Sequence, residues 1–146
     1  MRVTEKTDEL FQRIKEISDS CFEGVERPPE FALRYEFDHG DIFTRSAGFT
    51  KDSERIVSFA LVTRTTGHPY LWSLATLKSW RAYGFGSALL QQIIKYYHDQ
   101  HETQIDLTVN VNNPAQKLYF DNGFRAVTVK PHYYGELPGL RMRRTL

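Results

Sequence analysis

The stretch RAYGFGSALL, residues Arg81 to Leu90, decides how the rest of the sequence is interpreted. Two glycines, Gly84 and Gly86, stand one residue apart, and an apolar pattern typical of an amphipathic helix follows them directly. Glycine has no Cβ, so backbone N–H groups at such a helix start can approach a ligand closely. Those N–H groups lack partners within the helix, and the helix dipole is partly positive there. The stretch therefore predicts either an anion-binding loop or an ordinary tight turn.

Two common phosphate-binding motifs do not match this loop. A P-loop needs Gly-Lys followed by Ser or Thr, and the sequence has no such run. A dinucleotide-binding fingerprint needs a third glycine three residues after Gly86, where the sequence has Leu89. Judged on these residues alone, the structural turn and the anion site both remain open.

The composition describes one folded domain, residues 1–146, with no general affinity for nucleic acid. The chain is 40% hydrophobic and 25% charged, which fits a single buried core. Its net charge is +1, from 19 Lys and Arg against 18 Asp and Glu, so we expect neither nucleic acid nor a membrane as a partner. Cys21 is the one cysteine and cannot form an internal disulfide. We therefore expect a cytoplasmic protein without a signal peptide or membrane span.

Hydrophobic periodicity predicts an α/β (α+β mixed) protein. We expect helices after Asp8, over 31–37, from the glycine loop to about 101, and over 113–122. We expect strands over 1–4, 42–48, 55–64, 70–77, 105–111, 124–130 and 140–146, with turns at 38–41 and 66–69. The run IVSFALV is apolar on both faces, which is typical of a central strand. This order favours a mixed sheet with helices packed on both faces.

A second block, VNVNNPAQKLYFDNGF from Val109 to Phe124, follows the glycine loop after one helix and one strand. Together the two blocks resemble the GNAT-type N-acetyltransferases. In that family a loop similar to Arg81-x-x-Gly84-x-Gly86 binds the pyrophosphate of acyl-CoA. The matching residues of the second block are Asn113, Ala115, Leu118-Tyr119 and Gly123-Phe124. The resemblance implies a mixed, mostly antiparallel sheet of six to seven strands with about four helices on both faces.

The resemblance also implies acetyl-CoA as co-substrate. Backbone groups of residues 74–77 would hold the pantetheine arm and the thioester oxygen, and the loop would hold the pyrophosphate. The implied cofactor-binding residues are Leu74, Ala75, Thr76, Leu77, Arg81, Ala82, Tyr83, Gly84, Phe85, Gly86, Ser87 and Asn113.

Tyr119 is the candidate catalytic residue. By itself, a tyrosine on an amphipathic helix is more often a half-buried packing residue. The resemblance instead implies that Tyr119 points at the thioester sulfur and protonates the departing thiolate. A phenol pKa of about 10 and a thiol pKa of about 8.5 are close, so this proton transfer costs only about 2 kcal/mol.

Local rules predict how the helix that carries Tyr119 begins and ends. Asn113 is expected to cap it by accepting from the N–H of Gln116, with Pro114 in the first helical position. Gln116 stands where a capping box places Glu or Gln. Gly123 fits the left-handed residue just past the helix end.

The sequence leaves the amine substrate and the general base open. It resembles most closely the branch that acetylates protein N-termini, including those of ribosomal proteins, which has a Tyr-Tyr pair like Tyr133-Tyr134. That branch often carries a glutamate where this sequence has Thr108, and Asp106 is the only carboxylate on that predicted strand. A small-molecule amine such as a polyamine, an amino acid or an antibiotic remains an alternative, as does a non-catalytic acyl-CoA-binding domain. The oligomeric state, monomer or homodimer, also stays open.

Two segments are expected to line the amine site because no motif fixes them, namely 22–31 and 132–140. The candidate substrate-binding residues are Tyr133, Tyr134 and Glu136. Glu136 and the acids of the first segment, Glu23, Glu26 and Glu30, are candidates for the general base, although such residues are ordinarily solvated surface acids. His98 and His101 lie three residues apart, but the sequence offers no third ligand, so we expect no metal.

Overall fold

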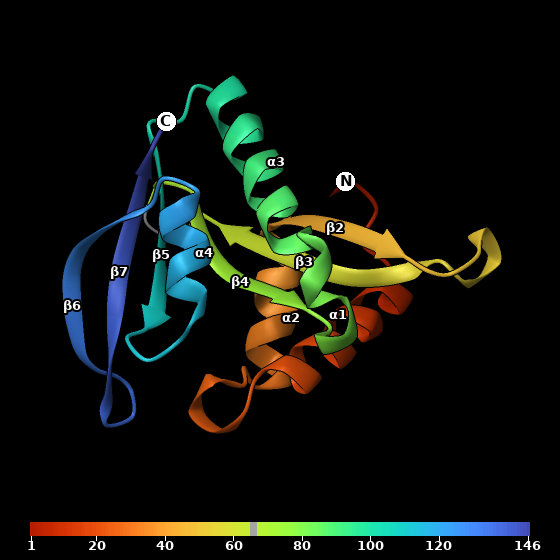
Figure 1. Cartoon of the computed structure of the whole chain (residues 1–146), viewed down its shortest axis with the longest axis horizontal. Coiled ribbons are helices and arrows are strands. Elements are labelled where there is room, and N and C mark those ends of the chain that lie inside the picture. Colours follow the sequence, from red (N-terminus) through yellow and green to blue (C-terminus); the bar gives the residue numbers. More distant parts are fainter. Residues whose placement is uncertain (65–66) are drawn as a thin grey trace.

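The computed structural model describes residues 1–64 and 67–146. Within them, seven strands form one sheet in the order β1-β2-β3-β4-β5-β7-β6 (Figure 1). The strands are β1 (Arg2–Val3), β2 (Asp41–Ala47), β3 (Arg55–Thr63), β4 (Tyr70–Thr76), β5 (Gln104–Asn110), β6 (Arg125–Tyr134) and β7 (Leu137–Thr145). Neighbouring strands are antiparallel except β4 and β5, which are parallel. The predicted mixed, mostly antiparallel sheet is confirmed.

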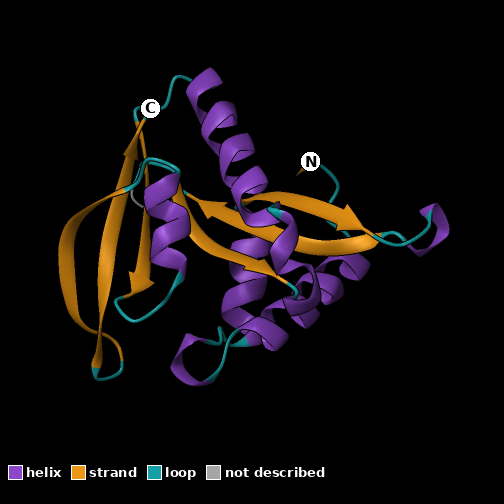
Figure 2. Ribbon diagram, in the orientation of Figure 1, coloured by secondary structure: helices purple, strands orange, loops and turns teal. Residues whose placement is uncertain are grey.

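Helices cover both faces of this sheet, as the sequence predicted (Figures 1 and 2). One face carries α1 (Asp8–Cys21) and α2 (Glu30–His39), and the other carries α3 (Phe85–Asp99) and α4 (Ala115–Asp121). Three short 3-10 helices, η1 (Gly24–Glu26), η2 (Lys51–Ser53) and η3 (Lys78–Tyr83), lie in the connections. None of the helices in the described ranges is long and apolar enough to cross a membrane.

Two hydrophobic cores hold the layers together. On the α1–α2 side, buried residues such as Ile14 and Phe37 pack against Phe59 and Leu61 of β3. On the α3–α4 side, the predicted apolar face of α3 packs with β5 and with Phe124. β3 is buried from Val57 to Thr63 on both faces, which confirms its predicted central position. Burial of this apolar surface is the main favourable contribution to the fold.

β4 and β5 pair over two residue pairs, Tyr70 with Asp106 and Leu71 with Leu107. Beyond them the two strands diverge, with β4 turning towards α1 and β5 turning away (Figure 1). The N–H of Asp106 donates to the carbonyl of Pro69 at 3.1 Å, so Asp106 directs its backbone groups towards β4. The backbone groups of Thr108, two residues further along β5, therefore also point towards β4. At Thr108, however, β4 and β5 are no longer paired, so these groups have no partner on β4. The divergence exposes backbone groups of both strands in the middle of the sheet.

Several predicted boundaries are wrong by a few residues. The first helix was expected after Asp8, but α1 already includes Asp8, because the hydroxyl of Thr7 caps it by accepting from the N–H of Leu10 at 3.1 Å. The turn expected at 38–41 is shorter, since α2 continues to His39 and Gly40 donates to the carbonyl of Glu36. The turn expected at 66–69 extends into Thr66, which lies outside the described residues.

The last two strands are longer than predicted. We expected a loop over most of 131–139, whereas β6 reaches Tyr134 and β7 starts at Leu137. The two strands pair with each other around a tight turn at Gly135, whose φ is 67°. This pairing satisfies backbone groups that local sequence alone left without partners. The end of this hairpin carries Tyr133 and Tyr134, and the hydroxyl of Tyr134 reaches the carbonyl of Thr108 on β5.

Candidate active site

The glycine loop connects β4 to α3 through η3. Gly84 is the residue at which the chain turns from η3 into α3. Gly84 has φ 77° and ψ 17°, the left-handed conformation that favours glycine. Ala88 makes the first helical bond, from its N–H to the carbonyl of Gly84 at 3.0 Å. No side chain of the described residues caps this helix start. The N–H groups of Phe85, Gly86 and Ser87 therefore remain available to an anion.

A cavity of about 460 Å³ lies beside this helix start. It is lined by Cys21, Phe22, Leu74, Ala75, Thr76, Arg81, Gly84, Gly86, Ser87, Asn113, Pro114, Ala115, Leu118 and Tyr119. Most of the predicted cofactor-binding residues are thus brought together. Phe22 was expected at the amine site and Leu118 was named only as part of the second sequence block, so neither was predicted to line the cofactor cavity.

Four predicted cofactor-binding residues lie outside this cavity. Leu77 packs against the core beneath α1 and α2. Ala82 and Tyr83 are exposed on η3, and the rings of Tyr83 and Phe85 face each other and Trp80. The side chains of Ala82, Tyr83 and Phe85 thus lie outside the cavity, so these residues could contribute to binding only through their backbone groups.

Contacts between α3 and α4 close one side of the cavity. A Cβ on Gly86 would lie 3.1 Å from Cδ2 of Leu118, so glycine permits the close approach of the two helices. The side chains of Ser87 and Asn122 meet at 3.5 Å. A Cβ on Gly84, by contrast, would meet nothing within 4 Å, so only its positive φ favours glycine at this position.

The start of α4 differs from the predicted cap. Oδ1 of Asn113 accepts from the N–H of Ala115 at 2.9 Å, not from Gln116, because the helix begins only at Ala115. Nε2 of Gln116 instead donates to the carbonyl of Asn110 at 3.2 Å and so ties α4 to β5. The left-handed conformation predicted for Gly123 is confirmed, with φ 88°.

Tyr119 is buried on α4, with 8% of its surface exposed, and its ring packs edge-on against Phe124. Burial raises the pKa of Tyr119 above the ordinary value of 10.0, so it remains a neutral phenol at physiological pH. Among the described residues, its hydroxyl has no hydrogen-bond partner. The proton is therefore free to be donated to a bound molecule.

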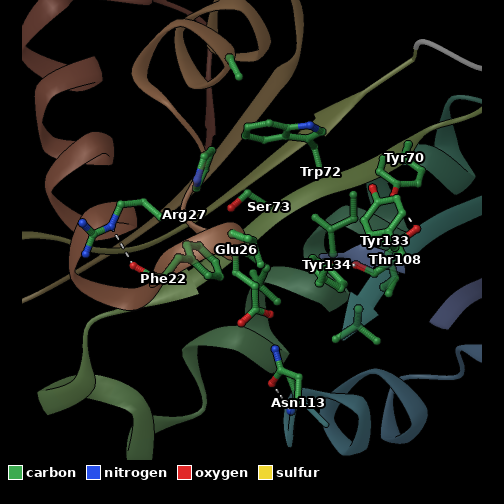
Figure 3. Close-up of a pocket in the computed structure, with 18 of the residues that line it drawn as sticks. Phe22, Glu26, Arg27, Tyr70, Trp72, Ser73, Thr108, Asn113, Tyr133 and Tyr134 are labelled. Atoms are coloured by element: carbon green, nitrogen blue, oxygen red, sulfur yellow. Dashed lines mark hydrogen bonds between the residues drawn. The ribbon is translucent and has the colours of Figure 1, made fainter. Parts of the chain in front are cut away.

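Tyr119 also lines a second cavity, of about 280 Å³. Figure 3 shows most of the residues that line this second cavity. The second cavity shares Phe22, Leu74, Asn113, Ala115 and Tyr119 with the first cavity, so the two meet at Tyr119. Its other lining residues are Val25, Glu26, Arg27, Pro28, Pro29, Ala32, Tyr70, Leu71, Trp72, Ser73, Leu107, Thr108, Val109, Tyr133 and Tyr134. Of the three candidate substrate-binding residues, Tyr133 and Tyr134 line this cavity, whereas Glu136 lies in the β6–β7 turn and does not.

Three tyrosines gather around Thr108 at one end of this second cavity (Figure 3). The hydroxyl of Tyr70 donates to Oγ1 of Thr108 at 2.6 Å, and the hydroxyl of Tyr134 donates to its carbonyl at 3.1 Å. Tyr134 thus takes the backbone acceptor that β4 leaves free where it diverges. The rings of Tyr133 and Tyr134 pack edge-on at 4.8 Å. Sequence analysis missed Tyr70, which was assigned only to a strand.

Asp106 does not reach either cavity. It is 2% exposed, and its oxygens accept from Arg141 at 2.7 Å and from Arg143 at 2.8 Å. Burial alone would raise the pKa of Asp106, but the hydrogen bonds from Arg143 and Arg141 outweigh it and hold the pKa below the ordinary value. Asp106 is therefore an ionised partner of two arginines, not a base that faces a substrate.

Glu26 is the one carboxylate among the described lining residues of the two cavities. Figure 3 shows its carboxylate pointing into the second cavity, between Phe22 and the tyrosines. Arg27 turns away, because Nε donates to the carbonyl of Phe22 at 3.0 Å and the guanidinium also reaches the carbonyl of Asp19. The second cavity therefore combines aromatic walls with a single negative charge.

A model of the acetyltransferase (GNAT) family matches residues 11–124. The chain belongs to the GNAT acetyltransferase family. Among GNAT relatives, it is 28% identical over 90 residues to a ribosomal protein bS18-alanine N-acetyltransferase of Haemophilus influenzae, covering 62% of each chain. It is 37% identical over 67 residues to an N-alpha-acetyltransferase of Sulfurisphaera tokodaii, covering 44% of this chain and 40% of the relative. The chain thus spans less than two thirds of the length of either relative.

The GNAT fold extends over the whole chain. The crystal structure of the ribosomal-protein-S18-alanine N-acetyltransferase from Escherichia coli superposes with a TM-score of 0.83 and 18% sequence identity. The superposition covers 99% of this chain and 94% of that chain. At this identity the likeness shows the fold.

Proposed function

We propose that the chain transfers an acetyl group from acetyl-CoA to the α-amine of a protein or peptide, by direct attack on the thioester. The observation that carries this proposal is the meeting of two cavities at Tyr119. One cavity adjoins a free helix N-terminus, and the other combines aromatic walls with one carboxylate. We place this activity in the cytoplasm, in keeping with the single cysteine.

The first cavity suits acetyl-CoA. The free N–H groups of residues 85–87 would bind the pyrophosphate, because a helix N-terminus favours negative charge. The diverging backbone of β4 would bind the pantetheine amides up to Leu74, which borders both cavities. This arrangement directs the thioester towards Tyr119.

The chemistry requires two proton movements. The amine nitrogen forms a bond to the carbonyl carbon, and the bond from that carbon to sulfur breaks. Tyr119 donates its proton to the leaving sulfur, and the proton released by the amine passes to solvent, from which Tyr119 is reprotonated. A hydrogen bond from the neutral phenol also stabilises the charge that develops on sulfur.

The second cavity suits an α-amine. An α-amine with a pKa of about 8 is roughly one-tenth neutral at pH 7, whereas a lysine amine with a pKa of about 10.4 is almost entirely protonated. An amine that is partly neutral in solution needs no strong base on the enzyme. Polyamines and aminoglycosides carry several ammonium groups, but the described lining residues offer only Glu26 as an anionic partner. These molecules are therefore the poorer candidates.

The test is acetyl transfer from acetyl-CoA to a panel of peptides with different first residues, spermidine and an aminoglycoside. We expect transfer to peptide α-amines. Tyr119→Phe should lower kcat about 100-fold or more, because general acid catalysis commonly contributes that much, while acetyl-CoA still binds. Tyr35→Phe, on the exposed face of α2, is the matched control and should retain full activity. Absence of transfer to every peptide, or an unchanged kcat in Tyr119→Phe, would overturn the proposal.

A further inference from the structure

The sheet next to the second cavity carries a row of polar side chains on one face. In the strand registers, Tyr70 of β4 stands beside Asp106 of β5, and Asp106 stands beside Arg143 of β7. Thr108 stands beside Arg141. Residues that are paired in register point to the same face of a sheet. Tyr70 and Thr108 line the cavity, and the other three residues are their neighbours in this row and do not line it.

Asp106 is the buried residue of this row to which both arginines bind. Its two carboxylate oxygens are shared between Arg141 and Arg143, and the side chain is almost fully buried. Replacing a buried ion pair by apolar residues is often neutral or stabilising, so such a cluster is weak evidence for a role in stability alone. The cluster lies next to Tyr70 and Thr108 in the sheet, so a role at the cavity would act through what each arginine contacts besides Asp106.

The two arginines differ in one respect. The guanidinium carbon of Arg141 lies over the ring of Tyr70, 5.8 Å from its centroid. Among the described residues, the side chain of Arg143 makes no such contact with an aromatic ring, although both arginines have Asp106 as their one hydrogen-bonding partner. The contacts therefore run from Asp106 through Arg141 to the ring of Tyr70, and from the Tyr70 hydroxyl to Thr108.

We propose that Asp106 and Arg141 are positioning residues for the amine site, which hold Tyr70 so that its hydroxyl oxygen accepts an N–H of the incoming amine. This inference rests on the proposed function. The cation–π contact with Arg141 holds the ring of Tyr70, and the hydrogen bond to Thr108 holds its hydroxyl. Thr108, at the position where related sequences often carry a glutamate, serves here as the acceptor that orients Tyr70.

The hydrogen-bonding capacity of the Tyr70–Thr108 pair fits this role. The Tyr70 proton is used in the bond to Thr108, so the phenolic oxygen can act towards other groups only as an acceptor. Burial raises the pKa of Tyr70 above the ordinary value of 10.0, so the residue stays a neutral acceptor and does not become a base. An amine that donates one N–H to Tyr70 is restricted in orientation, and its lone pair can then be directed at the thioester carbon.

The experiment compares Arg141→Met with Arg143→Met, a matched pair, since each removes one partner of Asp106. Transfer to the best peptide of the panel is measured together with acetyl-CoA binding and the thermal unfolding midpoint. We expect Arg141→Met to lower kcat/KM for the peptide by about 10- to 100-fold, because small misplacements of positioning groups have effects of this size. Arg143→Met should stay within about three-fold of the wild type, and both variants should bind acetyl-CoA normally. Arg141→Lys should lie between Arg141→Met and the wild type.

A double-variant cycle separates positioning from general destabilisation. If Arg141 acts through Tyr70, then Tyr70→Phe removes the same contribution, and Tyr70→Phe/Arg141→Met should be no worse than Tyr70→Phe alone. Losses that multiply in the double variant, or equal losses in Arg141→Met and Arg143→Met, would overturn the inference. A wild-type protein that acetylates no amine would instead contradict the proposed function, so the two failures are distinguishable.

Discussion

At the residue scale, the charge of the amine cavity comes from Glu26. Three acids, Glu23, Glu26 and Glu30, lie between the end of α1 and the first residue of α2, and nothing in their local sequence separates them. The structure gives Glu26 alone of the three a place in the cavity wall, while Glu23 and Glu30 are exposed. We infer that Glu26 attracts the protonated α-amine and holds it near the tyrosines.

Replacement of Glu26 tests this role through both KM and pH. A carboxylate stabilises a neighbouring ammonium group and so raises the pKa of the bound amine. Glu26→Gln should therefore raise KM for the peptide about 10-fold, and the acidic limb of the kcat profile should move to lower pH. Steady-state kinetics between about pH 6 and 9 check both effects, with Glu23→Gln as the control. A large loss of kcat at unchanged KM would show that Glu26 acts as a general base instead.

At the element scale, the acetyl-CoA cavity depends on how closely α3 and α4 approach. Sequence analysis predicted both helices and the glycines before α3, because spacing within one segment carries that information. It did not predict that Gly86 faces Leu118, since this contact joins helices that are separated by a whole strand. The same limitation explains the underestimated β6 and β7, whose lengths depend on their pairing with each other.

Substitution of the loop glycines separates the need for space at Gly86 from the need for a positive φ at Gly84. Gly86→Val should weaken acetyl-CoA binding more than about 10-fold, because its side chain meets Leu118 and displaces α4. Gly84→Val should weaken binding through its positive φ, whereas Gly84→Asn should bind nearly normally, because asparagine tolerates that conformation. Calorimetric titration with acetyl-CoA, together with circular dichroism, checks these expectations. Normal affinity in Gly86→Val would contradict the assigned cavity.

At the scale of the whole molecule, Asp106 joins β5 to β7 through Arg141 and Arg143. These strands form the half of the sheet that carries Thr108 and, through the hairpin, the tyrosine pair. The cluster thus lies in the part of the fold that must stay in register with β4 for the cavity to keep its shape.

The stability of the molecule should depend on this carboxylate at acid pH. The pKa of Asp106 is lower in the folded protein than its ordinary value of 3.8, so the folded state favours the ionised form. Its contribution to the free energy of unfolding is complete above about pH 4 and is lost as the pH falls through the lower folded value. Urea unfolding at pH 3 to 7 should show a shallower acid decline in Asp106→Asn than in the wild type, with Asp52→Asn as a surface control. Identical slopes would contradict this contribution.

The sequence by itself determined what short-range spacing encodes. It located the glycine loop and the helix behind it, the helix that carries Tyr119, the central strand β3 and the membership of a mixed sheet, because each depends on residues within about 15 positions of one another. Only the tertiary structure brought Glu26, Tyr70, Thr108 and Tyr134 around one cavity. It also placed the guanidinium of Arg141 over the ring of Tyr70. These residues come from an α1–α2 connection and three strands that diverge or pair far along the chain. Their meeting depends on strand register and helix packing, which no local pattern specifies.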